Sequence, residues 1–204
     1  MRFYEPLEST INSLKKDIES IPNDRKKVLE EVSDYVRNQR DSGNRVKLNF
    51  ICTHNSRRSH LAQIWTSVAA HHFGMDNIET YSGGTEATAF NPRAVAALDR
   101  AGFRIENPGG DNPRYKVHFS DEAEPITCFS KTFDDGFNPS ENFAAIMTCS
   151  DADENCPFIP GAEKRISVPY RDPKESDGTP DESKTYAERS RQIAAEWFYM
   201  MSQV

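Results

Sequence analysis

Apolar residues recur at helical spacing along the first forty residues of the chain. Between Leu7 and Ile21 they stand at alternating steps of four and three, and a similar pattern returns between Val28 and Val36. Pro22-Asn23-Asp24 separates the two stretches and caps the second. We therefore predict a helical hairpin over about residues 5–42, within an N-terminal extension that spans residues 1–44.

The apolar seam of this hairpin has two alternative uses. It can pack on the rest of the same chain, or it can pair with a second copy to form a homodimer. Two heptads are short for a coiled coil, so we favour packing within the chain over the homodimer.

From residue 45 onward, short apolar runs alternate with helical stretches. Buried strands are expected at 46–51, 78–84, 143–148 and 165–169, and helices after residues 58 and 91 and over 186–201. Such alternation is typical of an α/β fold, here a parallel four-stranded sheet with helices on both faces. Two short strands at 115–120 and 125–130 predict an inserted β-hairpin near residues 108–140. One catalytic domain would then span residues 45–204.

Candidate chemistry lies where the first of these strands ends. Cys52 follows the strand, and Arg58 comes six positions later at the start of a helix. A thiolate that acts on a tetrahedral oxyanion needs converging N–H donors and a cation that grips two oxygens. The helix N-terminus offers such donors and favours a bound anion. Asn55 tolerates the left-handed backbone that a tight loop requires, and Ser59 can donate a hydrogen bond to the Cys52 sulfur.

This context favours an oxyanion-binding nucleophilic loop over the plain alternative, a buried structural cysteine beside a surface arginine. Short motifs of this kind also arise by chance, so the flanking strand and helix carry the argument. The predicted nucleophile is Cys52 and the predicted oxyanion-gripping cation is Arg58. The remaining members of the loop are predicted to bind substrate: Thr53, His54, Asn55, Ser56, Arg57 and Ser59.

A second pair of thiols follows another strand, at Cys149 and Cys156. In a regular helix the rise of about 1.5 Å per residue would separate their Cα atoms by roughly 10 Å, beyond disulfide reach. A disulfide would therefore need the segment to loop or unwind, which its weak helix formers Ser, Asp and Asn allow. Two alternatives remain: unrelated cysteines on a loop, or a zinc site, which lacks a second Cys/His pair.

Asp172-Pro173 follows the last predicted strand. A carboxylic acid at this place could protonate a leaving oxygen, with the proline stiffening its approach. An Asp-Pro pair is more often a plain turn, so this feature gains weight only beside the others.

Composition narrows the class of protein. The 204 residues carry a net charge of −7, which argues against a nucleic-acid partner. We find no secretory apolar region after Met1 and no apolar stretch long enough to cross a bilayer. We expect a soluble cytoplasmic protein without a membrane partner, in which four cysteines serve catalysis, redox exchange or metal binding rather than structural disulfides.

Taken together, the loop from Cys52 to Ser59, the run from Cys149 to Pro157 and Asp172-Pro173 resemble the thioredoxin-coupled arsenate reductases. These enzymes share the fold of low-molecular-weight protein tyrosine phosphatases, and the resemblance covers about residues 46–201. It implies that arsenate is the substrate and a thioredoxin-like protein the partner. No metal and no cofactor beyond that external dithiol are expected.

The resemblance also implies a role for each group. Cys52 attacks arsenate held by Arg58 while Asp172 protonates the departing oxygen. Cys149 then attacks the Cys52 sulfur, arsenite leaves, and Cys156 takes over the disulfide by attacking Cys149. Cys128 has no part in this scheme and is expected to serve packing.

Three positions depart from the family pattern. His54 stands where glycine is usual, and Arg57 stands where cysteine is frequent, which adds positive charge near Cys52. Gln63 occupies the place of a glutamate that can bind potassium in reductases, which puts that site in doubt.

The main rival is a low-molecular-weight protein tyrosine phosphatase that hydrolyses phosphate monoesters through a phosphocysteine intermediate. Such enzymes usually place aromatic residues just after Asp-Pro, whereas Lys174-Glu175-Ser176-Asp177 follow here. We therefore favour the reductase. A regulatory oxyanion-binding module without turnover is a third class, and the presence of nucleophile, cation and acid together argues against it.

Overall fold

Four parallel strands form the central sheet of the computed structural model, which describes residues 2–155 and 158–204. The strands lie in the order β2-β1-β6-β7 and all run in the same direction. Their bounds are Val46–Cys52 for β1, Ile78–Gly84 for β2, Phe143–Met147 for β6 and Ala162–Ser167 for β7. The predicted parallel four-stranded sheet is thus confirmed, with Cys52 at the carboxyl end of a central strand.

Helices cover both faces of this sheet, as predicted. Alternate residues of a strand point to opposite faces, and Phe50 points to one face, where its ring meets Trp197 edge-on with centroids 4.9 Å apart. Ile51 points to the other face and joins an apolar cluster with Cys149 and Ala152. The first face is covered by α3 (Asn23–Asp41), α4 (Arg58–His72) and α7 (Glu182–Ser202), and the second by α6 (Ser150–Asn155).

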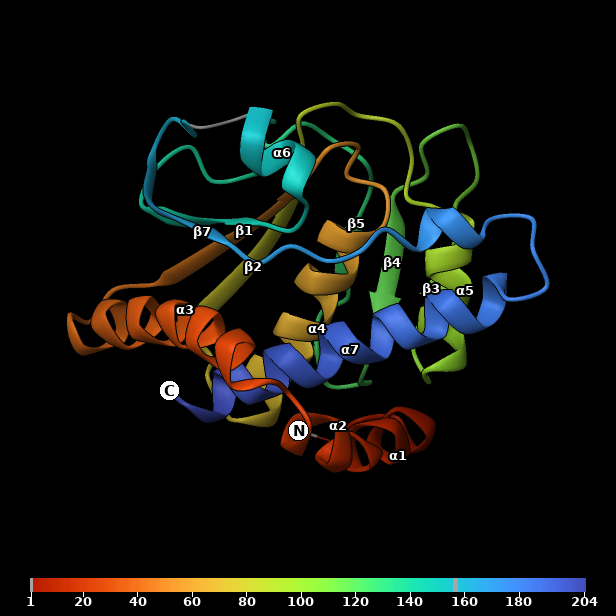
Figure 1. Cartoon of the computed structure of the whole chain (residues 1–204), viewed down its shortest axis with the longest axis horizontal. Helices are drawn as coiled ribbons and strands as arrows, with labels where there is room; N and C mark the ends of the chain where they lie inside the picture. The colour runs from red at the N-terminus through yellow and green to blue at the C-terminus, as the bar shows by residue number, and fades with distance from the viewer. Residues whose placement is uncertain (1, 156–157) are drawn as a thin grey trace.

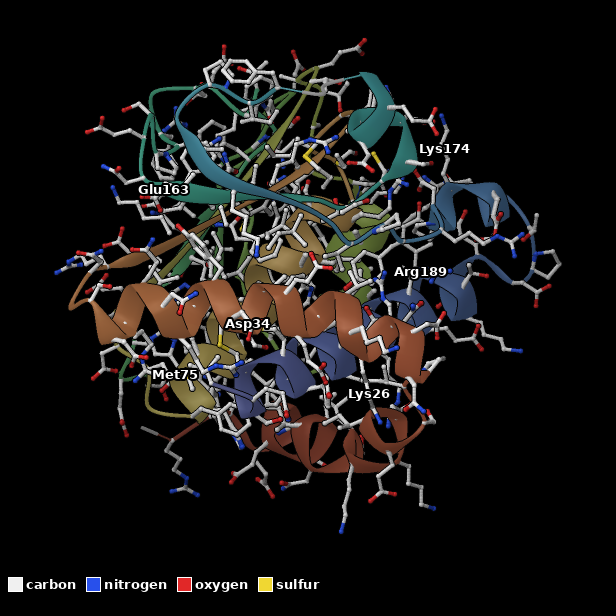
Figure 2. The ribbon with its side chains drawn as sticks, turned by 60° about the vertical axis from the view of Figure 1, so that its left-hand side comes forward. Lys26, Asp34, Met75, Glu163, Lys174 and Arg189 are labelled. Carbon is white, nitrogen blue, oxygen red and sulfur yellow. The ribbon has the colours of Figure 1, made fainter. Side chains whose placement is uncertain are left out.

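The N-terminal extension forms three helices instead of the two that were predicted. The first predicted helix divides at Leu14 into α1 (Glu5–Ser13) and α2 (Lys15–Glu19). Its apolar residues Leu7, Ile11 and Leu14 are buried in the main core. Both α2 and α3 pack against α7, and Figure 1 shows α1 and α2 at the end of the molecule opposite α6. In Figure 2, Lys26 and Asp34 mark α3 and Arg189 marks α7 beside it.

The insertion is a three-stranded antiparallel sheet rather than a hairpin alone. The predicted hairpin is present as β4 (Tyr115–His118) and β5 (Ile126–Cys128). A third strand, β3 (Arg104–Glu106), pairs with β4. We missed β3 because three residues with two exposed ends give too short an alternation to recognise. The helix predicted after Asn91 is α5 (Pro92–Arg100), capped by a hydrogen bond from the Arg93 N–H to the Asn91 side chain.

After β7 the chain enters a short 3-10 turn, η1 (Pro173–Ser176), before α7 begins. Lys174, labelled in Figure 2, marks the position of this turn. Across residues 2–155 and 158–204, no helix combines the length and the apolar character that a bilayer span requires.

A largely buried ion pair joins the N-terminal extension to the rest of the core. Arg25 of α3 reaches Glu196 of α7, with its Nε 2.9 Å and its Nη2 2.8 Å from Oε2. Glu196 is only 3% exposed, and the Arg25 guanidinium also lies 4.8 Å from the Tyr170 ring centroid. Removing one partner of a buried pair leaves the other charge without compensation.

We therefore expect Arg25→Met to lower the free energy of unfolding by about 3 kcal/mol, measured by urea denaturation. The matched control is Arg45→Met, which breaks the Arg45–Glu79 pair, because Arg45 is 73% exposed. That control should cost under about 1 kcal/mol. Adding Glu196→Leu to Arg25→Met should recover much of the lost stability, because it removes the uncompensated charge. Equal losses in Arg25→Met and Arg45→Met would contradict a special role for the buried pair.

Candidate active site

The segment between Cys52 and α4 forms a tight loop around Asn55. Asn55 has a positive φ of 44°, in the left-handed region that asparagine tolerates better than most residues. Its side chain fixes the loop on both sides. Nδ2 donates to Ser59 Oγ at 2.9 Å, and Oδ1 accepts from the backbone N–H of Lys131 at 3.0 Å. The predicted role of Asn55 in shaping the loop matches this geometry.

The sulfur of Cys52 lies at the bottom of this loop, buried and 3.1 Å from Ser59 Oγ. Because the Ser59 oxygen already accepts a hydrogen bond from Asn55, its own proton is free to point at the sulfur. A hydroxyl donor in this position can hydrogen-bond to the sulfur and hold it at the bottom of the loop. Cys52, Asn55 and Ser59 thus form one connected set, as a nucleophilic loop requires.

Arg58 begins α4 and contacts the predicted acid directly. Its Nη2 lies 2.8 Å from Asp172 Oδ2, and its Nη1 donates to the Tyr170 carbonyl at 3.0 Å. The buried Arg58 Nε has no hydrogen-bond partner among the described residues. Nε and Nη2 share the edge of the guanidinium that grips two oxygens at once. An oxyanion that binds this edge would meet a free Nε and compete with Asp172 for Nη2.

Asp172 divides its two carboxylate oxygens between this contact and the turn that follows. Oδ1 accepts from the Lys174 N–H at 3.0 Å and caps η1, while Oδ2 faces Arg58. The fold therefore brings the predicted cation and acid into direct contact, and Ser59, the residue after Arg58, contacts the Cys52 sulfur.

The second predicted thiol lies beside the same loop. Cys149 follows β6, is fully buried and belongs to the same apolar cluster as Ile51 and Cys52. Its sulfur is 3.5 Å from Thr53 Oγ1 and accepts from the Ala152 N–H at 3.4 Å. Thr53 is the immediate sequence neighbour of Cys52, so Cys149 contacts the nucleophilic loop directly. Cys156 lies outside the described residues.

The segment after Cys149 is a short helix, α6, in this structure. Asp153 fastens α6 to β7, because its side chain accepts from Ser167 Oγ at 2.7 Å and forms an ion pair with Arg165. A disulfide between Cys149 and Cys156 would require this helix to unwind, as the spacing of the two residues indicated.

The outer half of the loop is held by two neighbouring segments. The Thr53 carbonyl accepts from the Glu86 N–H at 2.8 Å, and Ser56 Oγ donates to the Ala89 carbonyl at 2.7 Å. His54 is exposed, with Nε2 3.6 Å from Glu86 Oε2, and its carbonyl accepts from Ser130 Oγ at 2.9 Å. Both segments belong to loops that follow strands, one after β2 and one after β5.

Gly84, at the end of β2, permits this close approach. A Cβ at this position would lie 2.7 Å from both the Asn55 nitrogen and the Thr53 oxygen, closer than real Cβ contacts. Gly84 is therefore a packing requirement of the nucleophilic loop, whereas a Cβ at the preceding Gly83 would meet Phe133.

The Arg57 side chain points at two residues that the sequence did not connect with it. Nε donates to the Tyr186 hydroxyl at 2.8 Å, and Nη2 lies 3.5 Å from Asp177 Oδ2. The positive charge of Arg57 is therefore paired with the Asp177 carboxylate.

Gln63, in α4, donates from Nε2 to the Thr80 carbonyl at 3.0 Å.

Comparison with known proteins decides the family. A profile of low-molecular-weight phosphotyrosine protein phosphatases matches residues 47–110. The chain is 32% identical to an arsenate reductase of Bacillus licheniformis over 142 residues, which cover 70% of this chain and 84% of the relative. It is 32% identical to an arsenate reductase of Staphylococcus aureus over 124 residues, covering 61% and 76%. This chain belongs to the arsenate reductase and low-molecular-weight phosphatase family.

Solved structures agree on the fold of the family. A low-molecular-weight phosphotyrosine phosphatase from Vibrio cholerae O395 superimposes with a TM-score of 0.53 at 13% identity, covering 77% of this chain and 95% of that one. A YwlE mutant from Bacillus subtilis gives 0.51 at 14% identity, covering 78% and 97%. At these identities the likeness extends to the fold alone.

Nothing in the sequence pointed to Lys131, a buried cation that packs behind the nucleophilic loop. Lys131, which holds Asn55 through its backbone, is only 2% exposed, and its Nζ lies 4.6 Å from the Phe129 ring centroid. Burial lowers the pKa of Lys131 to about 8. Burial, followed by the Lys131 charge, also lowers the pKa of His60 well below its usual value. No pattern around a single lysine in an irregular segment could have revealed this.

The remaining cysteine that the structure describes, Cys128, is buried in the core. Burial raises the pKa of its thiol to about 12, so it stays protonated and packs as an apolar group.

The buried Lys131 gives the chain a pH-dependent stability. An amine with a folded-state pKa of about 8 and an unfolded value of 10.5 binds its proton more weakly when folded. Below pH 8 both states are protonated, and the cost of burying the charge is present in full. Between pH 8 and about 10.5 the folded state has lost its proton and the unfolded state keeps it, so that cost fades as the pH rises.

We therefore expect Lys131→Met, which keeps the backbone bond to Asn55, to be more stable than the wild type at pH 7, by up to about 3 kcal/mol. The difference should shrink as the pH rises from 8 to 10. Urea denaturation of both proteins at several pH values measures it. A difference that stays constant across this range would contradict the assignment.

Proposed function

We propose that the protein reduces arsenate to arsenite with electrons from its own thiols. One observation carries this proposal: a second buried thiol, Cys149, lies beside the nucleophilic loop with its sulfur 3.5 Å from Thr53 Oγ1. Hydrolysis of a phosphate ester uses one thiol only. A second thiol at this position suits a reaction that consumes two thiols and forms a disulfide.

The first step forms a bond between sulfur and arsenic. The Cys52 thiolate attacks arsenic(V), and one arsenate oxygen leaves as water after accepting a proton from Asp172. Arg58 moves from Asp172 to the oxyanion and grips it through Nε and Nη2. The N–H groups of the loop between Thr53 and Arg58 hold the other oxygens. The oxidation state of arsenic does not change in this step.

The second step transfers the electrons. The Cys149 thiolate attacks the Cys52 sulfur, so an S–S bond forms while the S–As bond breaks. The electron pair of the broken bond stays with arsenic, which becomes arsenic(III) and leaves as arsenite. Two thiols have become one disulfide, and this balances the two-electron reduction.

The third step restores Cys52. Cys156 attacks the Cys149 sulfur, which frees the Cys52 thiolate and places the disulfide between Cys149 and Cys156. A thioredoxin-like dithiol protein then reduces that disulfide. The weak helix formers of α6 support this step, because the helix must unwind for the two cysteines to meet. The compartment that maintains such a reductant is the cytoplasm.

Hydrolysis of phosphate monoesters is the second candidate. The same Cys52, Arg58 and Asp172 would serve it, with water attacking a phosphocysteine in place of Cys149. The contact between Arg58 and Asp172 favours it as much as it favours arsenate reduction. Lys174 and Glu175 on η1 offer no aromatic wall for a phenyl ring, so small esters are the better substrates.

Replacing Cys149 by serine separates the two candidates. We expect Cys149→Ser to abolish multiple-turnover formation of arsenite with a thioredoxin system, by more than about 100-fold. Hydrolysis of 4-nitrophenyl phosphate should stay within about threefold, because the phosphocysteine route does not use Cys149. The matched control is Cys128→Ala, which removes a buried thiol outside the site and should keep arsenite formation per folded molecule.

Two results would overturn the reductase assignment. One is fast hydrolysis by the wild type with no detectable arsenite. The other is a Cys149–Cys128 disulfide in the oxidised protein, mapped by peptide mass spectrometry, because it would take Cys149 away from the proposed relay.

A further inference from the structure

A cluster of polar side chains joins the nucleophilic loop to the segment that carries Asp172. Arg57, in the loop, donates from Nε to the Tyr186 hydroxyl at 2.8 Å. Tyr186, in α7, donates in turn to Asp177 Oδ1 at 2.7 Å. Arg57 Nη2 closes the triangle at 3.5 Å from Asp177 Oδ2. Asp177 also faces Arg93 of α5, whose Nε lies 3.7 Å from Oδ1.

The cluster is shielded enough to hold its geometry. The side chains of Arg57 and Asp177 are 12% and 24% exposed, so their attraction is screened less than that of a surface pair. Burial and the bond to Asp177 raise the pKa of Tyr186 to about 12. Tyr186 therefore keeps its proton and remains a donor to Asp177 across the physiological range.

Asp177 and Asp172 flank the same rigid turn. Asp172 caps the start of η1, and Asp177 stands directly after its end, with its N–H bonded to the Lys174 carbonyl at 3.0 Å. Pro173 fixes one backbone angle within the turn. Because only four residues separate them, holding Asp177 in place also restricts where the Asp172 carboxylate can lie.

The arrival of substrate makes this restraint important. Without an oxyanion, Asp172 is held from one side by Arg58. An oxyanion that takes Arg58 Nη2 removes that contact at the moment when the acid must donate its proton. The restraint that then remains acts through η1 and Asp177.

We propose that Arg57 and Asp177 form a latch that positions Asp172 for proton donation once the oxyanion has displaced it from Arg58. The Arg57 side chain is then a positioning residue rather than an oxyanion ligand. This inference rests on the proposed function, because it concerns the acid of the same site.

The test compares two esters that differ in their need for the acid. 4-Nitrophenolate leaves without help, whereas phenolate needs a proton from Asp172. We expect Asp177→Ala and Arg57→Met to lower kcat/KM for phenyl phosphate at least tenfold more than kcat/KM for 4-nitrophenyl phosphate. Inhibition by inorganic phosphate should change less than threefold. Single-turnover arsenite formation, which needs no external reductant, should fall about tenfold.

Three further variants make the test specific. Arg57→Lys keeps the positive charge, so its ratio of kcat/KM for the two esters should lie between those of Arg57→Met and the wild type. The double variant Arg57→Met/Asp177→Ala should be no worse than Asp177→Ala alone, because both substitutions remove the Arg57–Asp177 interaction. The matched control is Arg171→Gln, in the same segment, which breaks the exposed pair with Glu175 and should leave the ratio of kcat/KM for the two esters unchanged.

The outcomes distinguish the latch from a general structural role and from the proposed function. Equal losses on both esters, weakened phosphate inhibition, the same effect in Arg171→Gln, or multiplying losses in the double variant would each overturn the latch. A wild type that hydrolyses esters without forming arsenite would overturn the reductase and leave the ester ratio as the test of the latch. A wild type with neither activity would overturn both.

Discussion

The two hydrogen bonds of the Asn55 amide connect parts of the molecule that are far apart in sequence. One bond reaches Ser59 in the first turn of α4, and the other reaches the backbone of Lys131 after the inserted sheet. A non-glycine residue in the left-handed region costs free energy, and it keeps this conformation only where the surrounding structure holds it. Here a single side chain fixes the loop and also occupies one acceptor site of Ser59, which leaves the Ser59 proton for Cys52. The chemistry of the thiol therefore depends on packing behind the loop.

The N-terminal extension and the segment after the inserted sheet support the site from different distances. The segment after β5 touches the nucleophilic loop itself, because Lys131 binds Asn55 and Ser130 binds the His54 carbonyl. The N-terminal extension acts from farther away. Its Arg25 lies against the ring of Tyr170, and the Tyr170 carbonyl holds Arg58. Both segments thus contact the backbone that presents the predicted catalytic groups, and neither supplies such a group of its own.

The sequence was sufficient for the parts of the structure that follow from local pattern. The strand before Cys52, the helix after Arg58 and the turn at Asp172 each have a short signature, and parallel topology then brings their ends together. The sequence was insufficient where the position of a side chain is set by contacts with residues far away in the chain. The partners of Arg57 lie 120 and 129 positions away, and the buried Lys131 is visible only once the insertion is folded onto the loop. The division at Leu14 has no proline or glycine to announce it.

Two features of the site must change during the proposed reaction: the Arg58–Asp172 ion pair and the position of α6. Arg58 has its bidentate edge half occupied by Asp172, so substrate binding has to break an ion pair that the free protein makes. Cys149 is buried at the start of a helix tied to β7 by Asp153, so the electron transfer has to loosen α6. The two changes involve opposite ends of the loop, Arg58 for the ion pair and Thr53 for Cys149, and separate contacts. Oxyanion binding can therefore be kept while the disulfide relay is impaired, and the acid can be misplaced while both thiols remain in position.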